Sequence, residues 1–227
     1  IDFGGMFDAH HVTPDIPCVD QLEEIMAIGC DGLKLLSGKP DRRKWIGHPL
    51  DGPAFEPMLR RLEETRFPVL WHVGDPPEFW NPDAVPLWAK QNRWWYDDTH
   101  PPKAQIDREI AHVLRRHPKL NLILPHFFFI SQDLVEAGRL LDAHPNVFFD
   151  LAPGVEMFHN FTAQHDAARA FFIKYQDRII YGSDAGIAKH QTHIKRSWMI
   201  QQFLQTGDLI EVPQDPFMWP DERPPLR

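Results

Sequence analysis

Short apolar runs alternate along the chain with longer segments in which apolar residues recur at helical spacing. Strands are predicted for the apolar runs at residues 1–7, 32–36, 69–73, 120–127, 147–151 and 179–181. Several of these runs carry polar residues only at their C-terminal end. That pattern is typical of strands buried on both faces of a parallel sheet.

The segments between the strands show the i, i+3, i+4, i+7 pattern of amphipathic helices. In the first, Val19, Leu22 and Ile25 share one face, and Gly29 ends the segment. Further helices are predicted at about residues 55–62, 106–114, 132–144, 163–175 and 190–204, with Ser131 as N-cap of the segment 132–144. The alternation of strands and helices predicts a parallel α/β fold.

Two architectures have this order, a doubly wound open sheet and a (β/α)8 barrel. No GxGxxG or Walker loop follows any predicted strand, which favours the barrel. Only six strand–helix units are found, whereas a complete barrel of this kind has eight. We therefore expect one domain over residues 1–227, a TIM-barrel-like fold that lacks two N-terminal strands, unless further strands lie within residues 75–102.

Charge and composition narrow the classes of partner. The net charge is −8 and the basic residues form no long cluster, so neither nucleic acid nor an anionic membrane is expected as a partner. The sequence shows no membrane-spanning stretch and no signal-peptide pattern. Cys18 and Cys30 form no CxxC motif and are expected to be free thiols, as in a reducing compartment. These features predict a cytoplasmic protein that binds a small molecule; a homo-oligomer is compatible with them.

Three predicted strands end in residues that can bind metal or move protons. His72 lies in VLWHVG, His126 in LILPHF and Asp184 in IIYGSDAG. In a parallel barrel all strand ends of this kind meet at one mouth, although they are far apart in the sequence. Imidazole and carboxylate are ligands of catalytic zinc, which keeps one position open for water. A lone histidine at a strand end is more often structural, but three such residues at corresponding positions favour a site.

These motifs resemble those of the amidohydrolase superfamily. HVGDP, LPHF, GSDAG and GCDGLKLL are similar to sequences of the branch that includes aminocarboxymuconate-semialdehyde decarboxylase and the resorcylate decarboxylases, and the resemblance spans residues 1–186. It implies a distorted (β/α)8 barrel with one divalent metal, zinc more often than manganese. It further implies that His72 binds the metal, that His126 acts on water or substrate, and that Asp184 both binds metal and transfers protons.

The chain departs from this family at its first strand, where the family has a His-x-His pair that supplies two metal ligands. The sequence around His10 and His11 is superficially similar, but neighbouring residues of a strand point to opposite faces. We interpret His10 as a residue of the loop at the mouth, facing substrate. Without the missing pair, His72 and Asp184 alone are expected to bind metal weakly or not at all.

Further residues are candidates for binding substrate. Lys34, within GLKLL, corresponds to a position that some amidohydrolases use as a carbamylated metal bridge, but an ordinary charged lysine at a strand end is the simpler interpretation. Asp150 could face the pocket or support a histidine ligand, and Glu156 and His159 lie on the loop beyond it. Residues 74–102 contain Trp80 and Arg93 within an aromatic cluster, which fits either a pocket for a flat anionic substrate or a subunit interface.

These observations lead to three functional hypotheses. The first is a metal-dependent hydrolase that acts on a C–N or C–O bond of a small carboxylated or cyclic substrate. The second is a non-oxidative decarboxylase of an aromatic or muconate-type acid. The third is a catalytically silent fragment or assembly domain, which the missing ligand pair keeps open.

Overall fold

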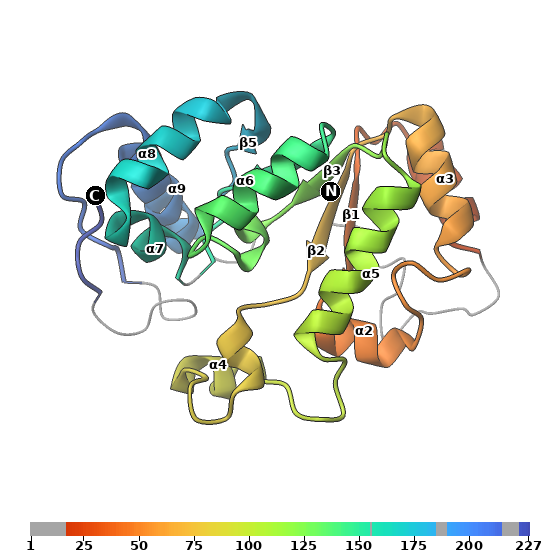
Figure 1. The fold of residues 1–227 in the computed structure, drawn as a ribbon, viewed down its shortest axis with the longest axis horizontal. Coiled ribbons are helices and arrows are strands. Elements are labelled where there is room, and N and C mark those ends of the chain that lie inside the picture. Colours follow the sequence, from red (N-terminus) through yellow and green to blue (C-terminus); the bar gives the residue numbers. More distant parts are fainter. Residues whose placement is uncertain (1–16, 155, 185–189, 215–222) are drawn as a thin grey trace.

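A computed structural model describes residues 17–154, 156–184, 190–214 and 223–227; from residue 190 to 193 it describes the main chain only. Five parallel strands form one sheet in the order β1-β2-β3-β4-β5 (Figure 1). The strands are β1 Leu33–Gly38, β2 Val69–Val73, β3 Leu122–Leu124, β4 Val147–Asp150 and β5 Ile179–Ile180. Five predicted strands are thus confirmed, and the sixth, at residues 1–7, lies outside the described residues.

Each strand follows its predecessor along the chain and pairs with it in register. Leu33 of β1 is opposite Val69 of β2, which is opposite Leu122 of β3. Within the described ranges, β1 and β5 each pair on one side only, so the sheet does not close into a barrel there. The expected α/β class and incomplete barrel are therefore confirmed.

Helices connect the strands and cover one face of the sheet. Helix α5 packs against β2, and α6 packs against β4. The α-helices are α1 Cys18–Ala27, α2 Pro40–Ile46, α3 Glu56–Thr65, α4 Leu87–Gln91, α5 Lys103–Arg116, α6 Leu134–Ala143, α7 Met157–Ala163, α8 His165–Lys174 and α9 His190–Gln205. The short 3-10 helices are η1 Pro77–Trp80, η2 His126–Phe129 and η3 Gln176–Arg178.

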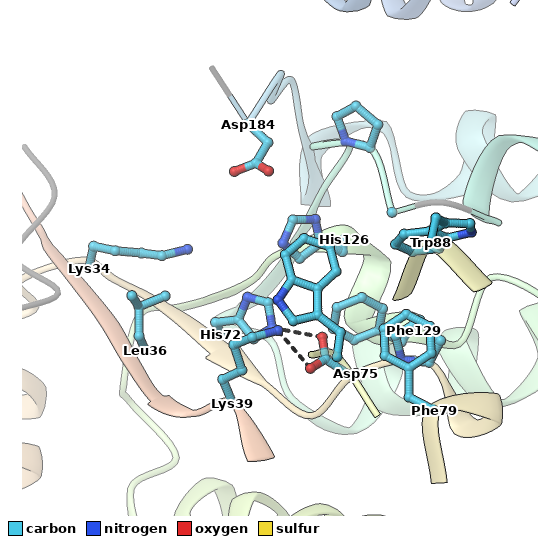
Figure 2. Close-up of a pocket in the computed structure, with 14 residues that line it drawn as sticks. Lys34, Leu36, Lys39, His72, Asp75, Phe79, Trp88, His126, Phe129 and Asp184 are labelled. Carbon is cyan, nitrogen blue, oxygen red and sulfur yellow. Dashed lines mark hydrogen bonds and ion pairs between the residues drawn. The ribbon is translucent and has the colours of Figure 1, made fainter. Parts of the chain in front are cut away.

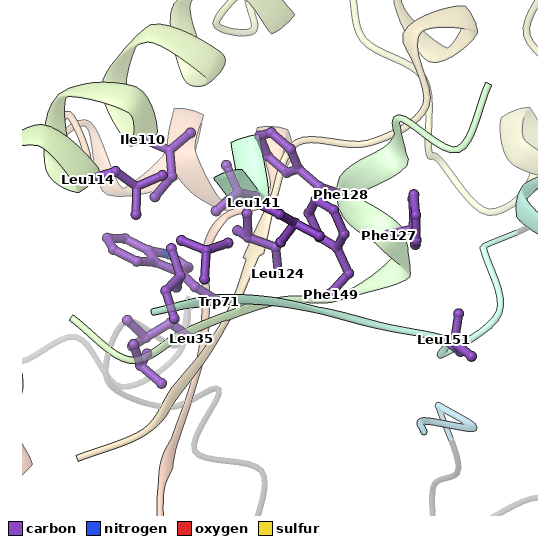
Figure 3. Close-up of a cluster of buried hydrophobic side chains, with 14 of the residues drawn as sticks. Leu35, Trp71, Ile110, Leu114, Leu124, Phe127, Phe128, Leu141, Phe149 and Leu151 are labelled. Atoms are coloured by element: carbon purple, nitrogen blue, oxygen red, sulfur yellow. The ribbon is translucent and has the colours of Figure 1, made fainter. Parts of the chain in front are cut away.

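Alternation along the strands separates the core from the site. Leu35 and Trp71 belong to the buried core that also contains Ile110 and Leu114 of α5 (Figure 3). The alternate positions Lys34 and Leu70 are only partly buried. Because successive residues of a strand point to opposite faces, Lys34, Leu70 and the neighbouring His72 share the face opposite the helices. This is the face that a complete barrel would enclose.

Several predicted boundaries were wrong in detail. Asp133, and not Ser131, caps α6, because the Asp133 side chain accepts a hydrogen bond from the main-chain N–H of Glu136 at 2.9 Å. The helix expected at residues 163–175 is α8, and α7, which was not predicted, precedes it and meets it at Gln164. Strand β3 is shorter than expected, and His126 opens η2. Residues 75–102 contribute η1 and α4 and no strand (Figure 1).

A buried ion pair fixes α2 against α5. The Glu109 carboxylate accepts two hydrogen bonds from the Arg43 guanidinium, at 2.9 and 2.8 Å, and one from the main-chain N–H of Leu50 at 2.9 Å. Arg43 is only 6% exposed and Glu109 equally so, which leaves little water to compensate for a lost partner. The pair matters for function because Lys39, which lines the candidate site, directly precedes α2.

Among the helices described, none is long and apolar enough to cross a membrane.

Candidate active site

A cavity of about 260 Å³ opens where the strands end, on the sheet face opposite the helices. Four of the predicted site residues line it, namely Lys34, His72, His126 and Asp184 (Figure 2). The structure thus brings Lys34 of β1 together with residues at or just beyond the ends of β2, β3 and β5, as expected for a parallel sheet. The other polar lining residues are Lys39 and Asp75, and the aromatic ones are Phe79, Trp88, Trp94 and Phe129.

The two histidines lie side by side at the centre of the cavity. Their ring centroids are 5.1 Å apart, and both rings contact Phe129. His72 is 8% exposed and His126 is 7% exposed. Burial lowers the pKa of both imidazoles, and the proximity of His72 lowers the pKa of His126 further. Both side chains are therefore neutral near neutral pH and can accept a proton or a metal.

The loop after β4 determines which nitrogen of His126 is free. Nδ1 of His126 lies 3.0 Å from the carbonyl oxygen of Ala152, which can only accept, so Nδ1 carries the proton. Nε2 is then the unprotonated nitrogen. The Asp150 carboxylate accepts from the main-chain N–H groups of His126, at 2.8 Å, and Ala152, at 3.0 Å. Asp150 therefore holds the main chain of His126 in place and does not line the cavity.

The main chain that carries His126 adopts an unusual conformation. His126, Phe127, Phe128 and Phe129 all have positive φ, between 53° and 57°. Each non-glycine residue in this region costs on the order of 1 kcal/mol or more. Phe127 is fully buried and contacts the rings of Phe149 and Phe161, and this packing offsets the cost. Strain of this kind is concentrated at functional sites.

Asp75 joins the second histidine to a lysine and a tyrosine. One of its oxygens lies 3.3 Å from Nε2 of His72, and the other accepts from Lys39 Nζ at 2.8 Å and from the Tyr96 hydroxyl. Burial alone would raise the pKa of Asp75, but the Lys39 charge and the bond from His72 hold it well below its usual range. Burial and the Asp75 charge raise the pKa of Tyr96, which therefore remains a phenol.

Two lysines and several aromatic rings form part of the cavity wall. Lys34 and Lys39 both line it, and Lys39 Nζ lies 4.9 Å from the centre of the Trp94 ring. Trp88 and Phe79 supply a further aromatic wall. Ammonium groups and aromatic faces are the groups that orient small aromatic or carboxylated ligands.

The donor types at the cavity fit zinc, although their number does not complete a zinc site. Unprotonated imidazole nitrogen and carboxylate oxygen are zinc ligands, and catalytic sites take three protein ligands. Within the parts of the chain that the structure describes, no three histidine, cysteine, aspartate or glutamate side chains are grouped closely enough to hold a metal.

Other residues predicted to bind substrate lie away from this cavity. Arg93 is exposed and has positive φ, while Trp80 lines a separate cleft with Tyr96. His159 lies on α7, outside the cavity lining, and His10 is outside the described residues. The tryptophans that do line the cavity are Trp88 and Trp94.

Sequence reasoning missed the roles of Lys39, Asp75 and Tyr96. Asp75 follows His72 by three positions in HVGD, so a search for carboxylates near a candidate ligand could have found it. Lys39 and Tyr96 come from distant segments and carry no comparable signal. Phe129 was missed because it lies just beyond the predicted strand 120–127 and no sequence signal indicates the turn η2 that brings it to the cavity.

Glu156 is a second unusual carboxyl near the cavity. Both oxygens are buried with no hydrogen-bond partner among the described residues, and they lie close to Gly154, which lines the cavity. Burial, together with the charges of Glu78 and Asp75, raises the pKa of Glu156 to about 7. The folded protein therefore favours the neutral carboxyl.

This carboxyl predicts a pH dependence of stability. The raised pKa stabilises the folded state fully below the ordinary value of 4.5, and that contribution is lost as pH rises to about 7. The loss is on the order of 3 kcal/mol. Glu156→Gln should remove this decline and be more stable than the unmodified chain at pH 8, while the two are similar at pH 4.5. Urea unfolding across this range measures the difference.

The matched control is Glu24→Gln, because Glu24 is exposed on α1. It should leave the pH dependence unchanged. An identical decline in the Glu156→Gln variant would show that Glu156 is already ionised in the folded protein.

Comparison with known proteins gives one family and two structures. A family model described as Amidohydrolase matches residues 2–216. No curated protein sequence matches the chain. An uncharacterized TIM-barrel protein from Bordetella bronchiseptica is 16% identical with a TM-score of 0.53, over 81% of this chain and 54% of that one. The 4-oxalomesaconate hydratase from Rhodopseudomonas palustris is 15% identical with a TM-score of 0.45, over 91% of this chain and 60% of that one.

The first of these structures supports the TIM-barrel fold. The chain spans little more than half the length of each.

Proposed function

Because the chain belongs to the amidohydrolase family, we propose that it forms the greater part of a metal-dependent enzyme. The proposed reaction is hydrolysis of a C–N or C–O bond in a small carboxylated or cyclic substrate. The observation that carries this proposal is the convergence of His72, His126 and Asp184 on one cavity. A structural histidine needs no such neighbours, whereas this combination would supply a metal ligand, a base and an acid at one place.

His72 and Asp184 would hold the metal, together with ligands from outside the described residues. Zinc suits these donors best, and manganese is the alternative. When bound, such an ion lowers the pKa of water and polarises a carbonyl group. The affinity of His72 and Asp184 alone is expected to be weak.

The remaining groups orient substrate and transfer protons. Lys34 and Lys39 would bind its carboxylate, and the aromatic wall would hold its plane. His126, whose Nδ1–H donates to the Ala152 carbonyl, would direct its unprotonated Nε2 to the attacking water and accept a hydrogen bond from it. Asp184, exposed at the cavity rim, would take up and return the proton.

Two measurements test the proposal. Zinc content after equilibrium dialysis should be lower for His72→Ala than for the unmodified chain, and unchanged for His126→Ala. Turnover on a panel of aromatic acids, lactones and amides should yield hydrolysis product and should stop on addition of a chelator. Release of carbon dioxide instead would identify a decarboxylase. Absence of both zinc binding and turnover would favour a silent fragment or assembly domain.

A further inference from the structure

The segment after β2 turns back so that Asp75 meets the histidine three positions before it. Gly74 makes this turn with φ +75°, a conformation that side chains other than glycine rarely adopt, and its N–H bonds the Gly38 carbonyl oxygen at 2.9 Å. The Asp75 side chain is 4% exposed. The turn at Gly74 and the burial of the side chain therefore keep Asp75 next to His72.

The two oxygens of Asp75 have different partners. Oδ2 accepts from the Lys39 ammonium at 2.8 Å and from the Tyr96 hydroxyl, and Oδ1 lies 3.3 Å from Nε2 of His72. Figure 2 shows the contacts of Asp75 with His72 and Lys39 as dashed lines that end on the two carboxylate oxygens. A carboxylate can only accept hydrogen bonds, so His72 must donate from Nε2.

We propose that Asp75 is a positioning residue that fixes His72 in the Nε2–H tautomer, so that Nδ1 is the nitrogen offered to the cavity. Lys39 and Tyr96 hold the carboxylate in place. His126 is fixed in the opposite sense, since its Nδ1 donates to the Ala152 carbonyl. The two adjacent imidazoles thus present different nitrogens, Nδ1 from His72 and Nε2 from His126.

An asparagine at this position should reverse the tautomer. Lys39 and Tyr96 both donate to the same oxygen, so the amide oxygen of Asn would take that place. The amide NH₂ would then face Nε2 of His72, which could only accept from it. The His72 proton would move to Nδ1, and Nε2 would no longer be a donor. A residue that merely filled space would not have this effect.

The test reads the tautomer directly in the metal-free chain. Long-range ¹H–¹⁵N correlation spectra of ¹⁵N-histidine-labelled protein at pH 8 distinguish the two neutral forms, and His72→Gln assigns the signal. We expect Nε2–H for His72 in the unmodified chain and Nδ1–H in Asp75→Asn. The control is Asp97→Asn, which removes the exposed partner of His100 and should leave His72 unchanged.

An Nδ1–H tautomer in the unmodified chain would overturn the proposal even if Asp75→Asn did not fold. An unchanged tautomer in a folded Asp75→Asn variant would also overturn it.

The consequence for zinc rests on the proposed function, whereas the tautomer does not. If His72 binds zinc through Nδ1, Asp75→Asn should weaken zinc binding by about 10- to 100-fold, as is usual for the partner of a ligand histidine. A reversed tautomer with unchanged zinc affinity would support the positioning role and remove His72 from the metal site. The two failures are thus distinguishable.

Discussion

Glu109→Ala is expected to lower the free energy of unfolding by about 3 to 5 kcal/mol, because it leaves a buried guanidinium without its partner. Glu109 accepts two bonds from Arg43 and a third from the main chain at Leu50, and neither side chain has ready access to water. A further bond from Gln105 would be lost as well. Urea unfolding followed by circular dichroism measures the change.

The control is the exposed pair of Glu136 and Arg139, whose atoms lie 3.4 Å apart with both side chains more than half exposed. Glu136→Ala should cost less than about 1 kcal/mol from this pair, since solvent screens it. The double variant Arg43→Met with Glu109→Leu should recover much of the loss, because it removes the unpaired charge. A loss below about 1 kcal/mol for Glu109→Ala alone would show that water reaches the site.

Asp184→Asn is expected to reduce turnover by about 10²- to 10⁴-fold, the usual contribution of a positioned acid–base group. An amide neither takes up a proton in this pH range nor binds zinc as a carboxylate does. Asp184 is exposed at the rim of the cavity, so the substitution should change the free energy of unfolding by no more than a few tenths of a kcal/mol. Steady-state kinetics on the substrate found in the panel measures it.

The matched control is Asp177→Asn, at an exposed position in η3 just before the same strand. It should keep full turnover. Full turnover in Asp184→Asn would end the mechanism shared by the hydrolase and decarboxylase proposals, because both need this proton.

Periodicity predicted the parts of the fold that depend on burial. The predicted bounds of β2 and β4 agree with the observed bounds to within one residue. A continuous run of apolar side chains is stable only where both faces of the strand are covered, so the run itself marks the strand. The convergence of His72 and Asp184 followed from the same rule, since parallel strands end at one edge. To predict this part of the site, one needs to know only the order of strands and helices along the chain.

The rest of the site depends on loop conformation, which periodicity does not encode. Trp94 and Trp80 belong to one aromatic segment, yet the turns of η1 and α4 bring only Trp94 into the cavity. The same turns place Tyr96 on Asp75. The positive φ angles of Phe127 and its neighbours could not be predicted either, because the sequence has no glycine there to indicate a left-handed conformation.

The turn His126–Phe129 also links the aromatic core to the chemistry. The Phe127 ring packs against the rings of Phe149, Phe161 and Phe171, with ring centroids 4.6, 4.9 and 5.5 Å away. Those contacts hold an otherwise unfavourable main-chain turn, and the turn aims His126. Random mutagenesis for altered reactivity should therefore recover changes at Phe161 or Phe171, although neither residue lines the cavity. The position of His126 in the candidate site therefore depends on these buried phenylalanines as much as on the residues that line the cavity.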